Sequence, residues 1–199
     1  MTLLAVVRHG PTEWNTRGRV QGRTDVPLDA TGIAEVRRWS LPPDVDGFSW
    51  VSSPLTRTME TARILRGEEV RRDARLVEMD WAGWEGETLD ALRAELGDLM
   101  RAWEAKGLDF KAPGGESPRE LQARIAPFLV ELAGRAEDTV AVTHKGVIRA
   151  LYALATGWDM TGKPPQKLRD SCLHLFQLAA DGTPAPKRLN IPLAPGAGE

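Results

Sequence analysis

Four segments of the chain show the hydrophobic pattern of buried β-strands. Residues 3–7 (LLAVV) and 139–143 (TVAVT) are short apolar runs without a clean alternation of polar positions, which is typical of strands covered on both faces. Residues 48–52 (FSWVS) show a weaker form of this pattern, and residues 172–178 (CLHLFQL) are apolar between polar loops. The pattern therefore predicts four strands.

Between these strands, apolar residues recur at the three- and four-residue spacing of amphipathic helices. Four such stripes occur: one after Thr31-Gly32, one after Pro54, a longer one further along the chain, and one that ends before Gly157. The residues in these four stripes are Ile33, Val36 and Trp39; Met59, Ala62 and Leu65; Leu89, Leu92, Leu96, Leu99 and Trp103; and Val147, Ile148, Leu151 and Leu154. Each stripe predicts a helix with one buried face.

A further helix start is marked by local chemistry. The sequence Ser117-Pro118-Arg119-Glu120 is a capping box with proline at the first helical position, and it predicts a helix that runs to about Arg135. Pro127 lies inside this helix and should bend it, because proline removes one backbone donor. The buried face is expected to contain Leu121, Ile125, Phe128 and Leu132.

Strands that alternate with helices predict an α/β sandwich with a mostly parallel sheet. The segment Met160–Asp170 and the tail from Ala179, which is rich in Pro and Gly, are expected to be loops. No internal repeat and no linker divides the chain, so we expect a single domain over residues 1–199.

Composition and charge narrow the possible functions. The formal net charge of −2 provides no positive field that would attract nucleic acid or an acidic membrane. Cys172 is the single cysteine, which excludes an internal disulfide and favours a reducing compartment. The first apolar run is too short for a secretory signal, and no run is long enough to span a bilayer. We therefore expect a soluble, cytoplasmic protein.

Polar clusters follow three of the predicted strands, at the ends where parallel sheets bind ligands. Arg8-His9-Gly10 follows the first strand, residues 52–57 (SSPLTR) continue from the strand at 48–52, and Thr143-His144-Lys145-Gly146 closes the strand at 139–143. Two of the chain's three histidines occupy these positions. The third, His174, lies inside a predicted strand and is expected to be structural. The clusters predict a shared ligand site.

Six motifs follow one another along about residues 4–152: RHGPTEWN, VQGRTDVPLDATG, SSPLTRTMETA, LVEMDWAGWEG, PGGES and VTHKGVIRAL. In these motifs and their order, the chain resembles the histidine phosphatase (phosphoglycerate mutase-like) superfamily. The resemblance implies a three-layer sandwich with helices on both faces of the sheet. It also implies phosphoryl transfer on a small phosphorylated substrate, with neither a metal nor a cofactor.

The resemblance also implies roles for individual residues. His9 matches the nucleophile, which a neutral imidazole can be when its other ring nitrogen is fixed as a donor. Arg8 and Arg57 match arginines whose planar guanidinium groups hold phosphate oxygens, and His144 matches a second histidine, expected in its charged form. Glu78 matches the acid that protonates the leaving group and then activates water. Further positions on the phosphate side are Asn15, Gln21 and Gly22.

Several assignments stay open at this stage. Asp80 and Glu85 are neighbours of Glu78 and could replace it as the acid. Lys145 stands where many relatives have glycine, which alters the local backbone and could add a charge near the phosphate. Three arginines in the early loop could either be solvated or attract anionic substrates; they are Arg17, Arg19 and Arg23.

The choice between phosphatase and mutase depends on departures from the mutase pattern. Met79 follows Glu78 where mutases typically have arginine, and the early loop reads VQG where they usually have Thr-Gly. The chain is also shorter than typical mutases, and the basic residues of segment 84–115 are Arg93, Arg101, Lys106 and Lys111. These features favour hydrolysis of small phosphomonoesters. The alternatives are a cofactor-dependent phosphoglycerate mutase and a non-catalytic module that binds phosphorylated ligands.

Overall fold

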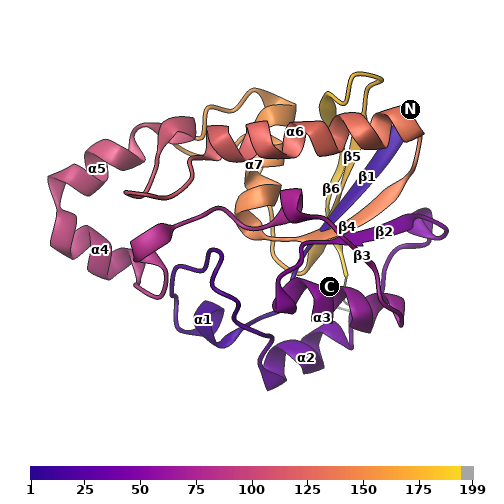
Figure 1. Cartoon of the computed structure of the whole chain (residues 1–199), viewed down its shortest axis with the longest axis horizontal. Coiled ribbons are helices and arrows are strands. Elements are labelled where there is room, and N and C mark those ends of the chain that lie inside the picture. Colours follow the sequence, from indigo (N-terminus) through magenta and orange to yellow (C-terminus); the bar gives the residue numbers. More distant parts are fainter. Residues whose placement is uncertain (194–199) are drawn as a thin grey trace.

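The computed structural model describes residues 1–193, and a sheet of six strands forms the centre of this region (Figure 1). The strand order is β3-β2-β4-β1-β5-β6. The pairs β3–β2, β2–β4 and β4–β1 are parallel, whereas β5 is antiparallel to both β1 and β6. The strands are β1 (Thr2–Arg8), β2 (Ser49–Ser52), β3 (Arg71–Arg72), β4 (Thr139–Thr143), β5 (Cys172–Leu178) and β6 (Pro184–Pro192). The predicted α/β class with a mostly parallel sheet is confirmed.

The predicted loop character of the tail from Ala179 is wrong for Pro184–Pro192, which form β6, and its last six residues lie outside the described residues. Strand β6 lies at the sheet edge and pairs with β5 alone, with Pro184 opposite Leu178 and Pro186 opposite Phe176. Proline has no backbone donor, so it is tolerated on an edge strand and would disrupt a central one. The prolines that suggest a loop are therefore compatible with this strand.

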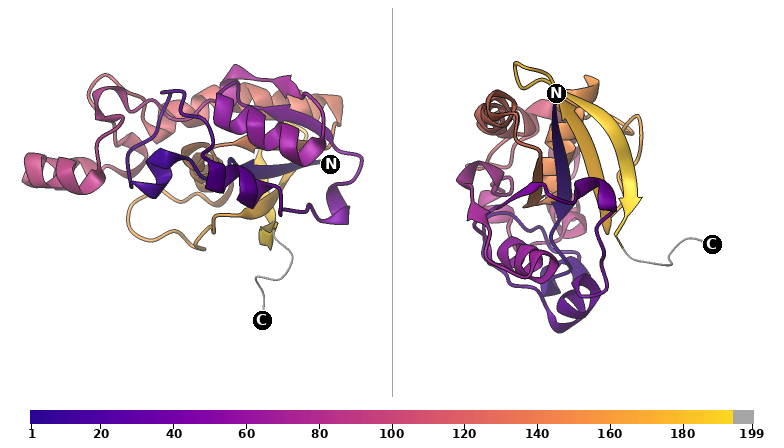
Figure 2. Two further views of the ribbon diagram at one scale, coloured as in Figure 1. Left: turned by 90° about the horizontal axis from the view of Figure 1, so that it is seen from below. Right: turned by 90° about the vertical axis from the view of Figure 1, so that its right-hand side faces the viewer.

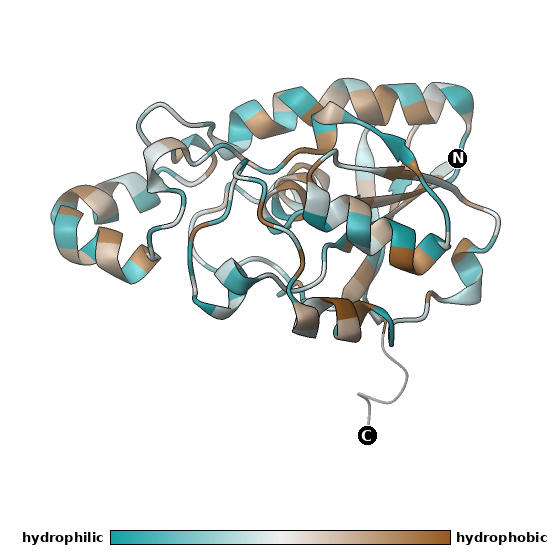
Figure 3. Cartoon of the chain, turned by 60° about the horizontal axis from the view of Figure 1, so that its bottom comes forward, coloured by the Kyte–Doolittle hydropathy of each residue, from teal (hydrophilic) through white to brown (hydrophobic). Residues whose placement is uncertain are grey.

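Helices surround the sheet and follow most of the predicted stripes. They are α1 (Glu13–Thr16), α2 (Ala30–Val36), α3 (Thr56–Arg66), α4 (Leu89–Leu96), α5 (Asp98–Glu104), α6 (Pro118–Arg135) and α7 (Lys145–Thr156), with 3₁₀ turns at Pro43–Val45, Ala74–Leu76, Ala82–Trp84 and Gly107–Asp109. The capping box of α6 is present, since the side chain of Ser117 accepts from the backbone of Glu120 and that of Glu120 from the backbone of Ser117. Figure 3 shows the alternating polar and apolar bands of α6.

Two details of the helix predictions are wrong. The long stripe from Leu89 to Trp103 is not one helix, because Gly97 adopts φ 52° and ψ −122° and separates α4 from α5. Glycine reaches this backbone region with little strain, so a helical spacing of leucines across it does not require a continuous helix. In α7, Leu154 is 40% exposed rather than buried.

The helices form layers on both faces of the sheet, which confirms the three-layer sandwich. Helices α6 and α7 cover one face, and α2 and α3 cover the other (Figures 1 and 2). Successive residues of β1 point to opposite faces: Leu4 and Val6 belong to one core cluster, whereas Ala5 and Val7 belong to the other. Within residues 1–193, no helix combines the length and the apolar character that crossing a bilayer requires.

Candidate active site

The three polar clusters lie side by side because β2, β4 and β1 are parallel neighbours. The backbone N–H of His9 donates to the Thr143 carbonyl at 3.0 Å, and that of Ser53 donates to the Val142 carbonyl at the same distance. The carboxyl ends of these strands therefore share one edge of the sheet, as predicted. A cavity of about 960 Å³ adjoins this edge, and its walls include Arg8, His9 and Glu78.

His9 follows β1 and is held as a neutral imidazole. Its Nδ1 lies 2.7 Å from the Gly10 carbonyl, so this nitrogen carries the proton and Nε2 retains a free lone pair. Burial, with the charges of Arg8 and Arg57, holds the pKa of His9 well below its usual value. A nucleophilic ring nitrogen is thus available at neutral pH.

His144 follows β4 and lies beside His9, with the two ring centroids 5.3 Å apart. Its Nε2 is 2.8 Å from the Ser53 hydroxyl, and its buried Nδ1 has no partner among the described residues. Burial, then His9 and Arg57, hold the pKa of His144 well below its usual value. The protein itself therefore favours a neutral His144, contrary to the expected charged form; a phosphoryl dianion beside the ring would act in the opposite direction.

Arg57 is fully buried in the first turn of α3. Its Nη1 donates to the Thr24 carbonyl at 2.9 Å and its Nη2 to the Gly22 carbonyl at 2.7 Å. Burial lowers the pKa of the Arg57 guanidinium. Arg57, His144 and Gly22 are not among the residues that line the cavity, so their contact with a phosphate stays a prediction. The Gly22 carbonyl serves here as an acceptor for Arg57. This glycine packs tightly there, since a Cβ on Gly22 would lie 2.1 Å from Glu85 Oε1.

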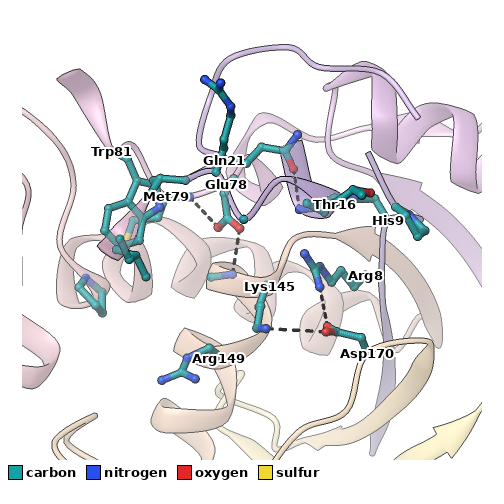
Figure 4. A pocket seen from close by; sticks show the side chains of 18 of the residues that line it. Arg8, His9, Thr16, Gln21, Glu78, Met79, Trp81, Lys145, Arg149 and Asp170 are labelled. Atoms are coloured by element: carbon teal, nitrogen blue, oxygen red, sulfur yellow. Dashed lines mark hydrogen bonds and ion pairs between the residues drawn. The ribbon is translucent and has the colours of Figure 1, made fainter. Parts of the chain in front are cut away.

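Arg8 projects into the cavity and is paired with an acid that the sequence pattern did not indicate. Its Nη1 lies 2.6 Å from Oδ1 of Asp170, and Oδ2 of Asp170 lies 3.7 Å from Nζ of Lys145 (Figure 4). Asp170 ends a loop 162 residues after Arg8, so no local spacing could have revealed the pair. Lys145 also lines the cavity.

Glu78 is distinguished from its acidic neighbours by its surroundings. Its Oε1 accepts from the Met79 N–H at 2.8 Å and its Oε2 from the Gly146 N–H at 2.9 Å (Figure 4). Burial raises the pKa of Glu78 in spite of these two bonds. Asp80 pairs with Arg23 instead, and neither Asp80 nor Glu85 is part of the cavity wall.

Asn15 and Gln21 line the cavity through a small network around α1. Thr12 and Asn15 form the capping box of this helix. The Asn15 Nδ2 donates to Gln21 Oε1 at 3.2 Å, and the Gln21 Nε2 donates to Thr12 Oγ1 at 3.0 Å. Both amides are therefore held in the cavity wall.

The arginines of the early loop differ in their surroundings. Arg19 lines the cavity and donates to the Gly86 carbonyl at 2.8 Å. Arg17 pairs with Glu13, and Arg23 pairs with Asp80 and Glu116. Among residues 1–193, no group of three or more His, Cys, Asp or Glu side chains is arranged to hold a metal ion.

This fold and site belong to a known class. The chain is a member of the histidine phosphatase superfamily (branch 1), whose family model matches residues 4–192. A 2,3-bisphosphoglycerate-dependent phosphoglycerate mutase of Azorhizobium caulinodans is 31% identical over 94% of this chain and 97% of its own length.

Solved structures of phosphatases are also similar. A phosphoserine phosphatase of Entamoeba histolytica in complex with 3-phosphoglyceric acid is 28% identical, with a TM-score of 0.80 over 96% of this chain and 97% of that one. A mycobacterial glucosyl-3-phosphoglycerate phosphatase in complex with VO3 is 26% identical, with a TM-score of 0.76 over 98% and 100% of the two chains. The relatives thus include both mutases and phosphatases. Chain length does not separate them, since this chain spans 97% of the mutase.

Proposed function

We propose that the protein is a metal-independent phosphatase that hydrolyses small phosphomonoesters through a phosphohistidine at His9. The observation that carries this proposal is that His9 and Glu78 line one cavity and have pKa values shifted in opposite directions. His9 has a depressed pKa and is neutral, whereas Glu78 has a raised pKa and is suited to hold a proton. A nucleophile and a general acid with separated pKa values are what this chemistry requires.

In the first step, Nε2 of His9 attacks phosphorus and the bond to the ester oxygen breaks. Glu78 gives its proton to the departing alkoxide. Arg8, in the cavity wall, contacts the phosphoryl oxygens, and Arg57 and His144, which are buried beside His9, help to stabilise the charge that develops on them. Asn15 and Gln21 complete the phosphate side of the site.

In the second step, the Glu78 carboxylate takes a proton from water, and the resulting hydroxide attacks the phosphohistidine. The P–N bond breaks, inorganic phosphate leaves, and both His9 and Glu78 return to their starting states. One carboxyl therefore acts first as acid and then as base, and the balance requires water alone as co-substrate.

Hydrolysis is favoured over mutase chemistry by the wall beside Glu78. Met79 is buried there and lines the cavity, so no cation follows the acid. The basic residues of segment 84–115 are largely engaged with acids, in the pairs Arg93–Glu104, Arg101–Asp98 and Lys111–Glu120. The names of the sequence relatives keep the cofactor-dependent mutase as the second candidate.

The proposal extends to the setting of the enzyme. One sheet with a core on each face supports a single domain over residues 1–199. Cys172 is buried and free, which supports a reducing, cytoplasmic compartment. The partner we propose is a small phosphorylated substrate, with no nucleic acid or membrane.

The deciding experiment follows the phosphoryl group in the presence of a chelator. We expect release of inorganic phosphate from nitrophenyl phosphate and from 3-phosphoglycerate, acid-labile labelling of the wild-type protein, and neither in His9→Ala. Conversion of 3-phosphoglycerate to 2-phosphoglycerate with added 2,3-bisphosphoglycerate, and little free phosphate, would instead identify a mutase. Binding without turnover would identify a non-catalytic module.

A further inference from the structure

A second cavity of about 110 Å³ adjoins the catalytic one. It lies between α7 and the loop of residues 160–170. Arg8, Lys145, Arg149 and Asp170 line both cavities (Figure 4). A ligand whose phosphate lies at His9 can therefore extend past these shared residues into the smaller space.

The smaller cavity carries an excess of positive charge. Five cationic side chains and one carboxylate, that of Asp170, contribute to its wall. The cations are those of Arg8, Lys145, Arg149, Lys167 and Arg169. The imidazole of His174 is also present, but burial lowers the pKa of His174 to about 4, so it adds no charge near pH 7. The wall thus has the character of an anion site.

Arg149 is a cation of this wall whose side chain has no anionic partner within residues 1–193. It is half-buried, and its guanidinium lies over the Trp158 ring, 5.2 Å from the ring centroid. No side chain of residues 1–193 forms an ion pair or hydrogen bond with this guanidinium, whereas the cavity-lining Arg93 has Glu104 at 2.8 Å. Burial lowers the pKa of Arg149, and a nearby anion would act in the opposite direction.

Lys145 lies one helical turn before Arg149, so both side chains project from the same side of α7. Its contact with Asp170 is long, at 3.7 Å, whereas Arg8 holds the same carboxylate at 2.6 Å. The Lys145 side chain is exposed and lines both cavities. Together, Arg149 and Lys145 provide a guanidinium and an ammonium group where the two cavities adjoin.

We propose that Arg149 and Lys145 form a second oxyanion site that binds a carboxylate or a second phosphate of the substrate while its first phosphate reaches His9. The inference rests on the proposed phosphatase function and deepens it. It makes the preferred substrate a small phosphomonoester that has a second anionic group on its leaving alcohol. Such a substrate would be fixed at both ends.

Matched substrate pairs test this proposal. 3-Phosphoglycerate and glycerol 3-phosphate share a three-carbon skeleton and differ in the carboxylate; propane-1,3-diol bisphosphate and 3-hydroxypropyl phosphate differ in the second phosphate. In the wild-type protein we expect kcat/KM to favour the doubly anionic member of at least one pair by tenfold or more. The pair that shows the preference identifies the second anion as carboxylate or phosphate.

Single substitutions test whether Arg149 and Lys145 cause the preference for the doubly anionic substrate. Arg149→Met and Lys145→Gln should each reduce the preference roughly 10-fold or more, the scale for loss of a hydrogen bond between charged groups. Arg63→Gln, at an exposed arginine on α3 outside both cavities, is the matched control and should keep it. Equal losses on both members of a pair, or no preference in the wild-type protein, would overturn the proposal.

A binding measurement keeps this test separate from the phosphatase proposal. Calorimetry with His9→Ala should show tighter binding of 3-phosphoglycerate or the bisphosphate than of the matched analogue that lacks the second anionic group, and Arg149→Met in that background should remove the difference. A protein that fails to hydrolyse any ester but shows this difference would contradict the phosphatase and support the anion site. Equal affinities for the members of both pairs would overturn the anion site whatever the turnover.

Discussion

Glu78 and Glu85 lie seven residues apart in the chain and have opposite proton affinities. Burial raises the pKa of Glu78, which faces the cavity. Burial acts in the same direction on Glu85, but hydrogen bonds from Thr24 and Arg23 outweigh it and hold the pKa of Glu85 below its usual value. Glu85 is therefore a permanent acceptor that orders the early loop, whereas Glu78 can exchange a proton with a substrate.

This difference predicts a substrate-dependent effect of Glu78→Gln. Hydrolysis of alkyl phosphates should fall roughly 10²- to 10⁴-fold, because an alkoxide requires a proton as it leaves. Hydrolysis of nitrophenyl phosphate should fall much less, because nitrophenolate barely needs one. Initial rates on both esters provide the measurement, and Glu87→Gln, at an exposed position, is the control. Equal loss on both esters would exclude Glu78 as the acid.

The same residue sets a pH dependence. A general acid works only while protonated, so turnover of alkyl phosphates should decline as pH rises through the pKa of Glu78. Because that pKa is raised, the decline should begin above the range of an exposed glutamate and should disappear in Glu78→Gln.

At the level of single residues, the sequence predicted the site residues that belong to a motif. It did not predict contacts between residues far apart in the chain. His9, Arg8 and Glu78 line one cavity as predicted, because each belongs to a motif at a strand end or beside one. Asp170 and Arg149 belong to no such motif. Their importance comes from charges that meet only after folding.

At the level of elements, the sequence predicted helices and strands best where they are determined by interactions between residues close together in the chain. The bounds of α6 agree with the capping box and with the stripe that follows it, since both act within a few residues. The break at Gly97 and the pairing of β6 depend on the wider fold. Leucines can keep a helical spacing across a glycine that leaves the helical region, and an edge strand accepts prolines that a sequence pattern assigns to a loop.

The start of α7 illustrates how an element positions the chemistry. Gly146 donates its N–H to Glu78, and a Cβ at Gly146 would lie 2.2 Å from the Glu78 Oε1. The first turn of this helix therefore approaches the carboxyl more closely than any other residue type would permit.

Gly146→Ala should consequently displace Glu78 and reduce kcat/KM for alkyl phosphates roughly 10- to 100-fold, the scale for misplacing a reacting group by about 1 Å. Alanine is a better helix former than glycine, so a helix-propensity effect would act in the opposite direction. Gly134→Ala in α6 is the matched control, because a Cβ there has no atom within 4 Å, and its activity should be unchanged. Full activity in Gly146→Ala would show that the carboxyl tolerates displacement.

At the scale of the whole molecule, all three histidines are buried and neutral. Burial is the largest cause of the lowered pKa in His9, His144 and His174 alike. His174 accepts from the Asn190 N–H at 3.1 Å, in agreement with its expected structural role. The fold therefore keeps uncharged imidazoles on β5 as well as at the catalytic edge.

This burial predicts a loss of stability in mild acid. Below pH 6.5 the unfolded chain takes up protons on three histidines, whereas the native state resists protonation, down to about pH 4 at His174. The free energy of unfolding should then fall with pH by up to about 1.4 kcal/mol per unit for each histidine. Glu78 acts in the opposite direction, since its raised pKa makes the native state the better proton acceptor.

The free energy of unfolding should therefore still fall between pH 7 and pH 5, with a net slope smaller than that of three histidines alone. Urea unfolding at pH 7, 6 and 5 and constant ionic strength measures it. His174→Gln keeps an acceptor for Asn190 but removes one titrating imidazole, so its slope should be smaller by about one proton. A free energy of unfolding that stays flat between pH 7 and pH 5 would mean that the native histidines are protonated as readily as those of the unfolded chain, and a neutral His9 nucleophile would then lose its physical basis.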